Sequence, residues 1–317
     1  MQHRFPAPMT VLSLVAPIFG LILVGWIAAL AGFLSEKVSD GLSEYVFSIA
    51  VPALIVATLT RPGLTGEITP SFWFSYFGGA ALSWGIGSLV GLRRAGVERR
   101  GAILHGFAAS QSNTVFIGVP MILQAYGEDG AFPLFMLLAV HLPLMMGCAT
   151  FLIEADGQAS LLTRLRGLAL VLLRNPIFLA LILGLGLKGA GLAPGGIVKA
   201  LVDSVAGTAS TCALIALGAG LVRYRVLHDL PSALGITVLK LGLHPLAVWL
   251  LAFHVFTMPP AYAGVATLFA AMPVGINAYL LAARYRTETG VVAAAVMLST
   301  LLAIFTTIGW LTLLGHA

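Results

Sequence analysis

Long apolar runs separated by short polar joints make up most of the chain. Each run comes close to the roughly 20 residues that an α-helix needs to cross the hydrocarbon core of a bilayer. The ten predicted transmembrane helices are residues 10–33, 38–60, 71–92, 102–126, 130–153, 174–190, 196–222, 231–257, 261–283 and 289–314. The first run is too long for the apolar core of a signal peptide, so we interpret it as a spanning helix. The pattern therefore predicts an all-α integral membrane protein.

Composition agrees with this interpretation and excludes several other classes. Of the 317 residues, 59% are hydrophobic and 9% are charged, which is too little charge to cover a soluble protein of this size. The basic residues form short clusters between apolar runs, not the continuous stripe of a nucleic-acid-binding protein. Cys148 and Cys212 each lie inside an apolar run and cannot build a metal site or a disulfide framework. Because no catalytic triad, metal-ligand spacing or nucleotide-binding loop is present, we expect neither an enzyme nor a bound cofactor or metal.

The positive charges indicate the orientation in the membrane. The joints after odd-numbered helices hold Lys37, Arg93, Arg94, Arg99, Arg100, Arg164, Arg166, Arg174, Arg223, Arg225, Arg284 and Arg286. The joints on the other side hold Arg4, Arg61, Lys188 and Lys199. Cytoplasmic loops are enriched in Lys and Arg. Twelve basic residues on one side against four on the other therefore predict that both termini lie outside the cytoplasm. We expect a multi-pass protein of the inner (plasma) membrane.

The two halves of the chain look alike. Pro120 lies deep in the fourth predicted helix and Pro273 deep in the ninth, 153 residues apart. This spacing predicts two five-helix repeats, residues 1–154 and 155–317. Since five is odd, the copies insert in opposite directions, as in many secondary transporters whose paired broken helices form the substrate site.

The fourth helix carries the strongest candidate chemistry. Gln111, Ser112, Asn113 and Thr114 follow one another inside an apolar run, where polar side chains are costly unless they face protein or water. Gly118 and Pro120 follow and weaken the helical hydrogen bonding, which frees backbone groups to bind a solute. We predict a substrate site here. The alternative is a kinked helix whose polar side chains hold neighbouring helices together.

The ninth helix repeats this combination with Pro273, Gly275 and Asn277. Because the two helices run in opposite directions, Asn113 and Asn277 should both lie on the cytoplasmic side of the breaks. We expect both side chains to line the site.

Three further polar residues lie inside predicted helices. His141 is either a hydrogen-bonded packing residue or a contact for substrate or a proton. Asp203 and Lys240 are intramembrane charges, which makes each a functional candidate. Their depths differ too much for a direct pair, and we expect the Lys240 side chain to snorkel toward the membrane surface.

Several of these segments resemble the auxin efflux carrier family, which includes plant PIN-type transporters and bacterial permeases. The matching segments are residues 51–54, 113–120, 174–176, 271–277, 282–285 and 299–300. The resemblance implies ten helices in two inverted repeats, with the fourth and ninth broken at Pro120 and Pro273 and crossing there. It also implies a scaffold of helices 1, 2, 6 and 7, usually dimeric, and a mobile transport domain of helices 3–5 and 8–10. The short joint 154–174 lacks the long loop of large plant members and favours a bacterial permease.

These observations predict a carrier of small organic anions. Helix N-terminal ends and asparagine amides at a crossover suit a carboxylate. The resemblance suggests a dicarboxylate such as malonate or malate, or an auxin-like monocarboxylate, and a homodimer as the assembly. The alternative is an ion-coupled symporter or antiporter of the related bile-acid or sodium–proton type, although neither broken helix contains an Asp or Glu. An intramembrane enzyme and a non-transporting receptor with this fold are the remaining alternatives.

Overall fold

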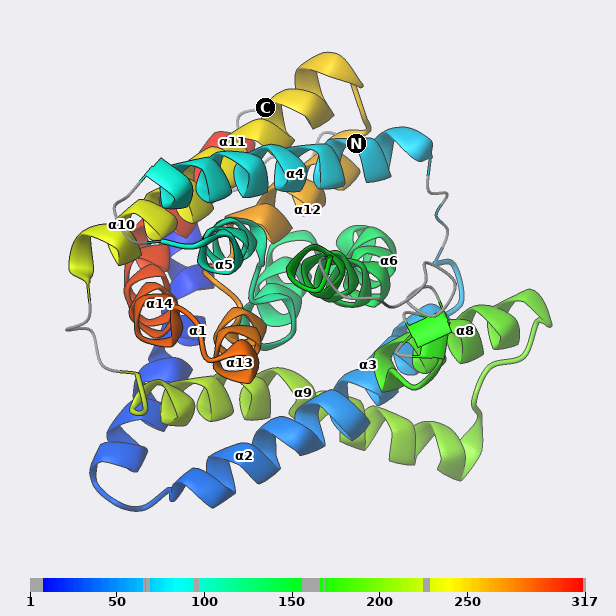
Figure 1. The fold of residues 1–317 in the computed structure, drawn as a ribbon. Coiled ribbons are helices and arrows are strands. Elements are labelled where there is room, and N and C mark those ends of the chain that lie inside the picture. The colour runs from blue at the N-terminus through cyan, green and yellow to red at the C-terminus, as the bar shows by residue number, and fades with distance from the viewer. Residues whose placement is uncertain are drawn as a thin grey trace.

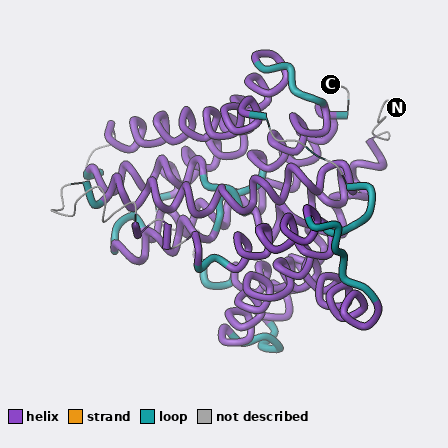
Figure 2. The backbone as a smooth tube through the Cα atoms, turned by 90° about the vertical axis from the view of Figure 1, so that its right-hand side faces the viewer, coloured by secondary structure: helices purple, strands orange, loops and turns teal. Residues whose placement is uncertain are grey.

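The computed structural model describes residues 8–64, 66, 69–93, 97–155, 166–167, 169–170, 172–224 and 229–315, and within them helices joined by loops and turns make up the fold. Figures 1 and 2 show the helices, several of which are π-helical turns (η). In the first part of the chain they are α1 (Pro8–Leu30), α2 (Glu36–Tyr45), η1 (Val46–Ala50), α3 (Val51–Leu59), α4 (Pro70–Arg93), α5 (Arg99–Ser110), η2 (Thr114–Gly118) and α6 (Val119–Ile153). In the second part they are α8 (Pro176–Gly189), α9 (Gly196–Leu221), α10 (Leu230–Val238), η3 (Leu239–Leu243), α11 (His244–Trp249), η4 (Leu250–Val255), α12 (Pro260–Ala271), α13 (Ile276–Tyr285) and α14 (Thr289–Leu314).

Six described helical stretches are long and apolar enough to cross a membrane. They are Val11–Leu30, Glu36–Leu59, Thr114–Ile153, Gly196–Leu221, Leu230–Val255 and Thr289–Leu314. The shorter apolar helices α8 and α12 have 14 and 12 residues. Helix α4 has 24 residues, but its glycines and serines dilute its hydropathy. The chain is therefore a multi-pass helical membrane protein, and the count of ten spans stays a prediction.

Two groups of helices pack mainly among themselves. Helices α1, α2, α3, α8 and α9 contact one another, and α1 crosses α9 closely at two glycines. A Cβ atom on Gly25 would collide with the backbone of Ile215, and one on Gly218 with the backbone of Ile22. Such small residues let membrane helices approach each other. The second group contains α4, α5 and α10–α14, with α6 packed against α12.

The boundary between the fourth and fifth predicted helices lies where the prediction put it. The range of α6 covers two helices that meet at a kink, and the non-helical residue at the kink is Gly127, with φ of 55° and ψ of −135°. Glycine accepts this left-handed φ without steric cost, which explains why the turn falls there.

The outer surface is rich in large apolar side chains, as expected for a protein solvated by lipid. Phe33, Ile197 and Phe305 are 83%, 80% and 71% exposed. Arg4, Arg94, Arg164 and Arg225, which contributed to the predicted orientation, lie outside the described residues.

Candidate functional site

Two breaks in helical structure meet near the middle of the molecule (Figure 1). One lies between α5 and η2 at residues 111–113, and the other between α12 and α13 at residues 272–275. The Asn113 N–H donates to the Pro273 carbonyl oxygen at 2.8 Å, and the Gly275 N–H donates to the Gln111 carbonyl oxygen at 2.9 Å. Ser112 and Val274 pair as an antiparallel bridge between these bonds. The two interrupted helices therefore cross through direct backbone pairing, and we call residues 111–113 with 272–275 the crossover.

Local sequence explains why the helices stop here. Short polar side chains such as Ser112 and Asn113 compete for backbone hydrogen bonds and disfavour helix interiors. In the second break Pro273 has no N–H, and the Ser299 hydroxyl accepts from the Val274 N–H at 3.0 Å. At Gly275 a Cβ atom would lie 2.8 Å from the Ser112 carbonyl oxygen, so glycine is required for the close crossing.

The predicted position of the first break was wrong. Pro120 was expected to break the fourth helix, yet the extended backbone ends at Asn113 and helical structure resumes at Thr114. Pro120 comes just after η2, so it lies inside the helix that begins at Thr114 and has no N–H to donate to the preceding turn. The π-helical turn η2, which contains Gly118, absorbs the irregular bonding before it. The second break does contain its proline, Pro273.

A cavity of about 310 Å³ borders the crossover. Its wall includes Asn113 and Thr114 at the start of η2 and Ile276 and Asn277 at the start of α13. The rest of the wall comes from α2, η1, the end of α9 and the remainder of α13. The other lining residues are Ser39, Asp40, Ser43, Glu44, Phe47, Ser112, Val115, Phe116, Ala216, Gly220, Arg223, Tyr224, Tyr279 and Leu280.

Charged and aromatic side chains occupy one side of this cavity. The Arg223 guanidinium lies 2.6 Å from the Asp40 carboxylate and also donates to the Glu36 carbonyl oxygen at 3.1 Å. The rings of Tyr224 and Tyr279 meet edge to face with centroids 4.9 Å apart. Burial, reinforced by Tyr279 and opposed by Arg223, raises the pKa of Tyr224 to about 12. Tyr224 is therefore an uncharged phenol at neutral pH.

Several buried polar atoms at the crossover have no hydrogen-bond partner within the described protein. They are the Asn113 side-chain nitrogen and both polar atoms of the Gln111 amide. Asn113 is only 3% exposed. Since buried polar groups in proteins are almost always paired, an unpaired amide beside a cavity is available to a ligand.

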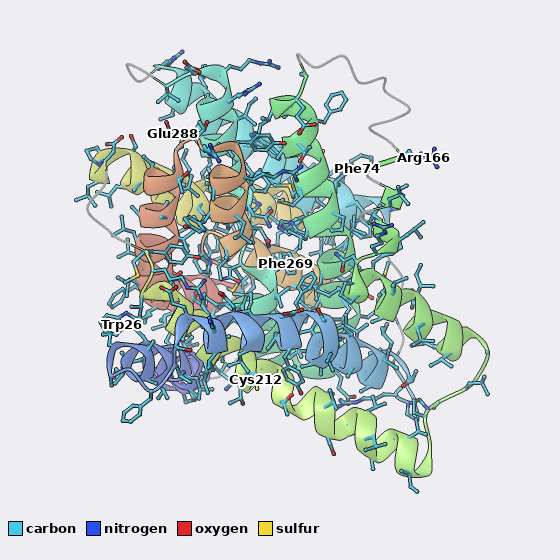
Figure 3. All side chains as sticks on the ribbon, turned by 60° about the horizontal axis from the view of Figure 1, so that its bottom comes forward. Trp26, Phe74, Arg166, Cys212, Phe269 and Glu288 are labelled. Carbon is cyan, nitrogen blue, oxygen red and sulfur yellow. The ribbon has the colours of Figure 1, made fainter. Side chains whose placement is uncertain are left out.

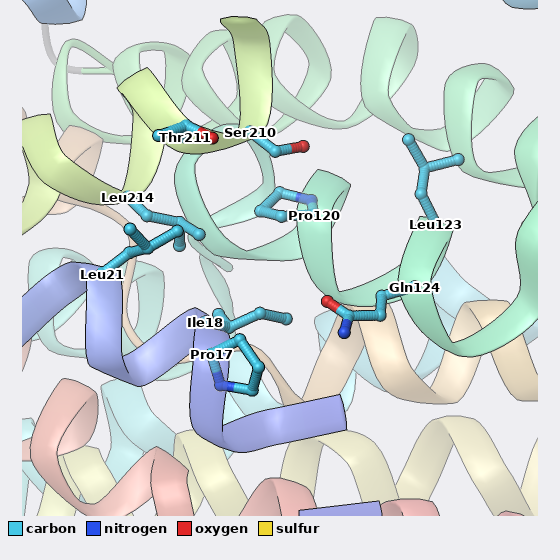
Figure 4. A pocket seen from close by; sticks show the side chains of 9 residues that line it. All are labelled: Pro17, Ile18, Leu21, Pro120, Leu123, Gln124, Ser210, Thr211 and Leu214. Carbon is cyan, nitrogen blue, oxygen red and sulfur yellow. The ribbon is translucent and has the colours of Figure 1, made fainter. Parts of the chain in front are cut away.

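The other predicted site residues lie in three different parts of the structure. Ser112, Thr114 and Asn277 line the cavity with Asn113. Gln111, Pro273 and Gly275 form the crossing itself. Pro120 lies in a second cavity of about 380 Å³ (Figure 4). Its other lining residues are Pro17, Ile18, Leu21, Leu123, Gln124, Ser210, Thr211 and Leu214.

His141 lines neither cavity. Its ring Nδ1 lies 2.9 Å from the Tyr76 hydroxyl oxygen, and its side chain is fully buried. His141 therefore has the hydrogen-bonded partner that a packing residue requires, while its Nε2 atom has none within the described residues.

Asp203 and Lys240, the two predicted intramembrane charges, lie in different environments. Asp203 forms an exposed ion pair with Lys199 one helical turn away on α9. Lys240 is fully buried and donates to the Ala270 carbonyl oxygen at 2.5 Å. The expectation that Lys240 snorkels toward the surface was wrong, because its side-chain nitrogen donates to a backbone acceptor inside the protein.

No local sequence pattern marks Asp40, Arg223, Tyr224 and Tyr279 as site residues. These residues come from α2, the end of α9 and α13, and only packing brings them together. Among the residues that the structure describes, no group of three or more His, Cys, Asp or Glu could hold a metal ion.

Comparisons with known proteins agree with a transport role. The family described as "Membrane transport protein" matches residues 10–311. A Rhizobium meliloti protein named "Putative malonate transporter" is 27% identical over 312 residues, covering 95% of each chain. An "Uncharacterized transporter" of Methanothermobacter thermautotrophicus is 25% identical over 308 residues, covering 93% of this chain and 94% of that protein. With nearly its whole length matched, the chain belongs to the membrane transport protein family.

Proposed function

We propose that this protein is a secondary transporter that moves small organic anions, such as carboxylates, across the membrane by alternating access. Its substrate site is the cavity beside the crossover. Asn113, Ser112, Thr114 and Asn277 contact the substrate, and Gln111, Gly118, Pro273 and Gly275 shape the backbone around it. The observation that carries the proposal is that two helix N-terminal ends border one cavity next to an unpaired buried amide.

The chemistry of these helix ends favours an anion. The helix that begins at Thr114 continues into α6 as far as the kink at Gly127, and α13 begins at Ile276. The first N–H groups of a helix have no intrahelical acceptor, and the helix dipole places partial positive charge there. Asn113 and Asn277 add amide donors without the desolvation cost of a buried charge. Two such ends directed at one cavity suit the two oxygens of a carboxylate.

The relatives and the size of the cavity support the proposed substrate class. A volume of about 310 Å³ accommodates a small ligand. The name of the Rhizobium meliloti relative supports a dicarboxylate such as malonate, with malate and auxin-like monocarboxylates as the other candidates.

The proposed architecture has ten spans in two inverted repeats, residues 1–154 and 155–317. Helices α1, α2–α3, α8 and α9 form the scaffold, through which two copies associate as a homodimer. The other helices form the transport domain, whose movement relative to the scaffold exposes the crossover to either side. With both termini outside the cytoplasm, as we propose, the cavity beside Arg223 lies on the cytoplasmic side of the crossover.

A thermal-shift screen of purified protein tests the proposal. A ligand present at 100 times its dissociation constant stabilises the folded state by about 2.7 kcal/mol. Malonate, malate, succinate and indole acetate are compared with sodium chloride at equal ionic strength. We expect at least one carboxylate to raise the melting temperature. If no carboxylate does so at millimolar concentration, the proposed substrate class is wrong.

A further inference from the structure

Lys240 lies at the inner end of the broken helix α12. Its side chain is fully buried, and its side-chain nitrogen lies 2.5 Å from the carbonyl oxygen of Ala270. Ala270 is the next-to-last residue of α12, which ends at the crossover. The last four carbonyl groups of a helix lack intrahelical donors and carry its partial negative charge. Lys240 thus places a titratable amine on the negative end of a half-helix.

The described elements around Lys240 supply no carboxylate to neutralise this amine. The described elements that pack against the η3 turn are α4, α5, α10, α11, α12 and α14. None of them contains an Asp or a Glu. An isolated ammonium in a low-dielectric interior is costly, so only the carbonyl end of α12 favours the charged form of Lys240.

The other half of the crossover is built differently. The end of α5 is capped by a neutral group, since the Ser83 hydroxyl donates to the Ala109 carbonyl oxygen at 2.7 Å. The amine at the end of α12 is therefore not a general requirement for ending a broken helix. A π-helical turn, η3, carries Lys240 into place, and such turns occur often at functional sites.

The titratable side chains within the described elements that pack against η3, together with His141 on α6, are bases or phenols. Near Lys240 lie His244 on α11, His141 on α6 and Tyr76 on α4, with Phe269 packed between the aromatic rings at the centre of the molecule (Figure 3). Of these elements, α12 also carries Tyr262, and α5 carries His105, which is paired with Glu288 at 2.8 Å. The charged ends of α4 and α5 add Arg93, Arg99 and Arg100, whereas α10 and α14 contain no titratable side chain.

This environment admits one positive charge and not two. Both ring nitrogens of His244 and the Nε2 atom of His141 are buried and lack hydrogen-bond partners within the described residues. A second proton there would add an unpaired charge beside Lys240. Lys240 is the base that has an acceptor at a helix end, so it is the group that can hold a single proton.

We propose that Lys240 is a proton-binding site that couples proton movement to anion transport. The inference rests on the proposed function. When an anion occupies the N-terminal ends of η2 and α13, its negative charge favours a proton on the Lys240 nitrogen, and the two move across together. Water on the loading side supplies the proton, and water on the release side accepts it after the anion leaves. With the site empty the lysine is a neutral amine, and the transport domain returns without the added charge.

This arrangement also replaces a metal cation. In many carriers with broken helices, the carbonyl ends of half-helices coordinate a coupling sodium ion. Here the Lys240 nitrogen already occupies the carbonyl end of α12, so transport needs no sodium. A positive charge on Lys240 attracts an anion at the crossover, so we expect its loss to weaken anion binding by about tenfold.

Isothermal titration calorimetry of purified protein with malonate tests the proposal. Titrations at one pH in two buffers of different ionisation enthalpy give the number of protons taken up per malonate bound. The variants are Lys240→Arg, whose charge is permanent, Lys240→Met, which has none, and His141→Gln. Lys188→Met serves as the matched control, because Lys188 also donates to a backbone carbonyl, that of Leu64, but far from the crossover.

Wild-type protein, His141→Gln and Lys188→Met should take up protons on binding malonate. Lys240→Arg should bind malonate without proton uptake. Lys240→Met should also bind malonate without proton uptake, and about tenfold more weakly than the wild type. Wild-type binding should be the same in sodium and in choline buffer. Proton uptake that persists in Lys240→Arg, or an absolute need for sodium, would overturn the inference while leaving the proposed function intact. Absence of binding heat for malonate, malate, succinate and indole acetate in the wild type would overturn both.

Discussion

Replacing Asn113 by alanine should separate substrate binding from folding. The Asn113 side chain lines the cavity, and its buried nitrogen has no partner within the described protein. Asn113→Ala therefore removes a donor that substrate needs and that the empty protein does not. We expect substrate affinity to fall while the melting temperature without ligand stays the same or rises.

The expected changes in affinity and in stability are estimated from the substrate-bound and the empty protein. A hydrogen bond to a charged group contributes about 1.5–3 kcal/mol, so affinity should fall about ten- to a hundredfold. An unsatisfied buried donor costs about 1–3 kcal/mol, and its removal releases part of that cost in the empty protein. If Asn113 only held helices together, the substitution should instead destabilise the fold by about 0.6 kcal/mol.

A second asparagine provides the control. The Asn175 side-chain oxygen accepts from the Ile177 N–H at 2.9 Å and caps α8 away from the cavity. Asn175→Ala should lower stability by about 0.5–2 kcal/mol and leave substrate affinity unchanged. Thermal unfolding with and without malonate measures both quantities. A variant Asn113→Ala that binds malonate with wild-type affinity would refute the site assignment.

Three further predictions address the crossover, the cavity and the orientation. Gly275→Ala should destabilise the protein by about 1–3 kcal/mol and abolish stabilisation by substrate, because its Cβ atom would lie 2.8 Å from the Ser112 carbonyl oxygen. Gly207→Ala, which has open space around the added Cβ atom, should have neither effect, and thermal unfolding compares the two variants. Because the raised pKa of Tyr224, about 12, keeps its phenol neutral, Tyr224→Phe should leave the shape of the pH profile of uptake unchanged between pH 6 and 9; a new inflection in that interval would contradict this. A C-terminal reporter that fluoresces only in the cytoplasm should stay dark, and a bright signal would reverse the proposed topology.

Apolar length and polar joints predicted where helices lie, because both properties are local. Each predicted range contains helix in the structure, and the break at Pro273 lies where a missing N–H predicts it. The position of the other break was predicted wrongly from Pro120. There the competing side chains at residues 111–113, seven or more positions earlier, end the helix, and the proline fits into the next helix.

The cavity wall could be predicted only in part. Asn113 and Asn277 stand out because amides are rare inside apolar helices. The pairing of Arg223 with Asp40 joins residues 183 positions apart, and no periodicity in the sequence indicates it. Lys240 was recognised as an unusual charge, but its position depends on the π-helical turn and on where α12 ends, and both are set by packing.

Counterflow into proteoliposomes tests most directly whether the protein is a carboxylate carrier. Purified protein is reconstituted into vesicles loaded with unlabelled malonate, and the uptake of trace labelled malonate is followed with Asn113→Ala and empty vesicles as controls. The account predicts a transient accumulation of label above equilibrium in wild-type vesicles and strongly reduced accumulation in Asn113→Ala vesicles. Wild-type vesicles that take up labelled malonate no faster than empty vesicles, with malate and indole acetate giving the same result, would contradict it.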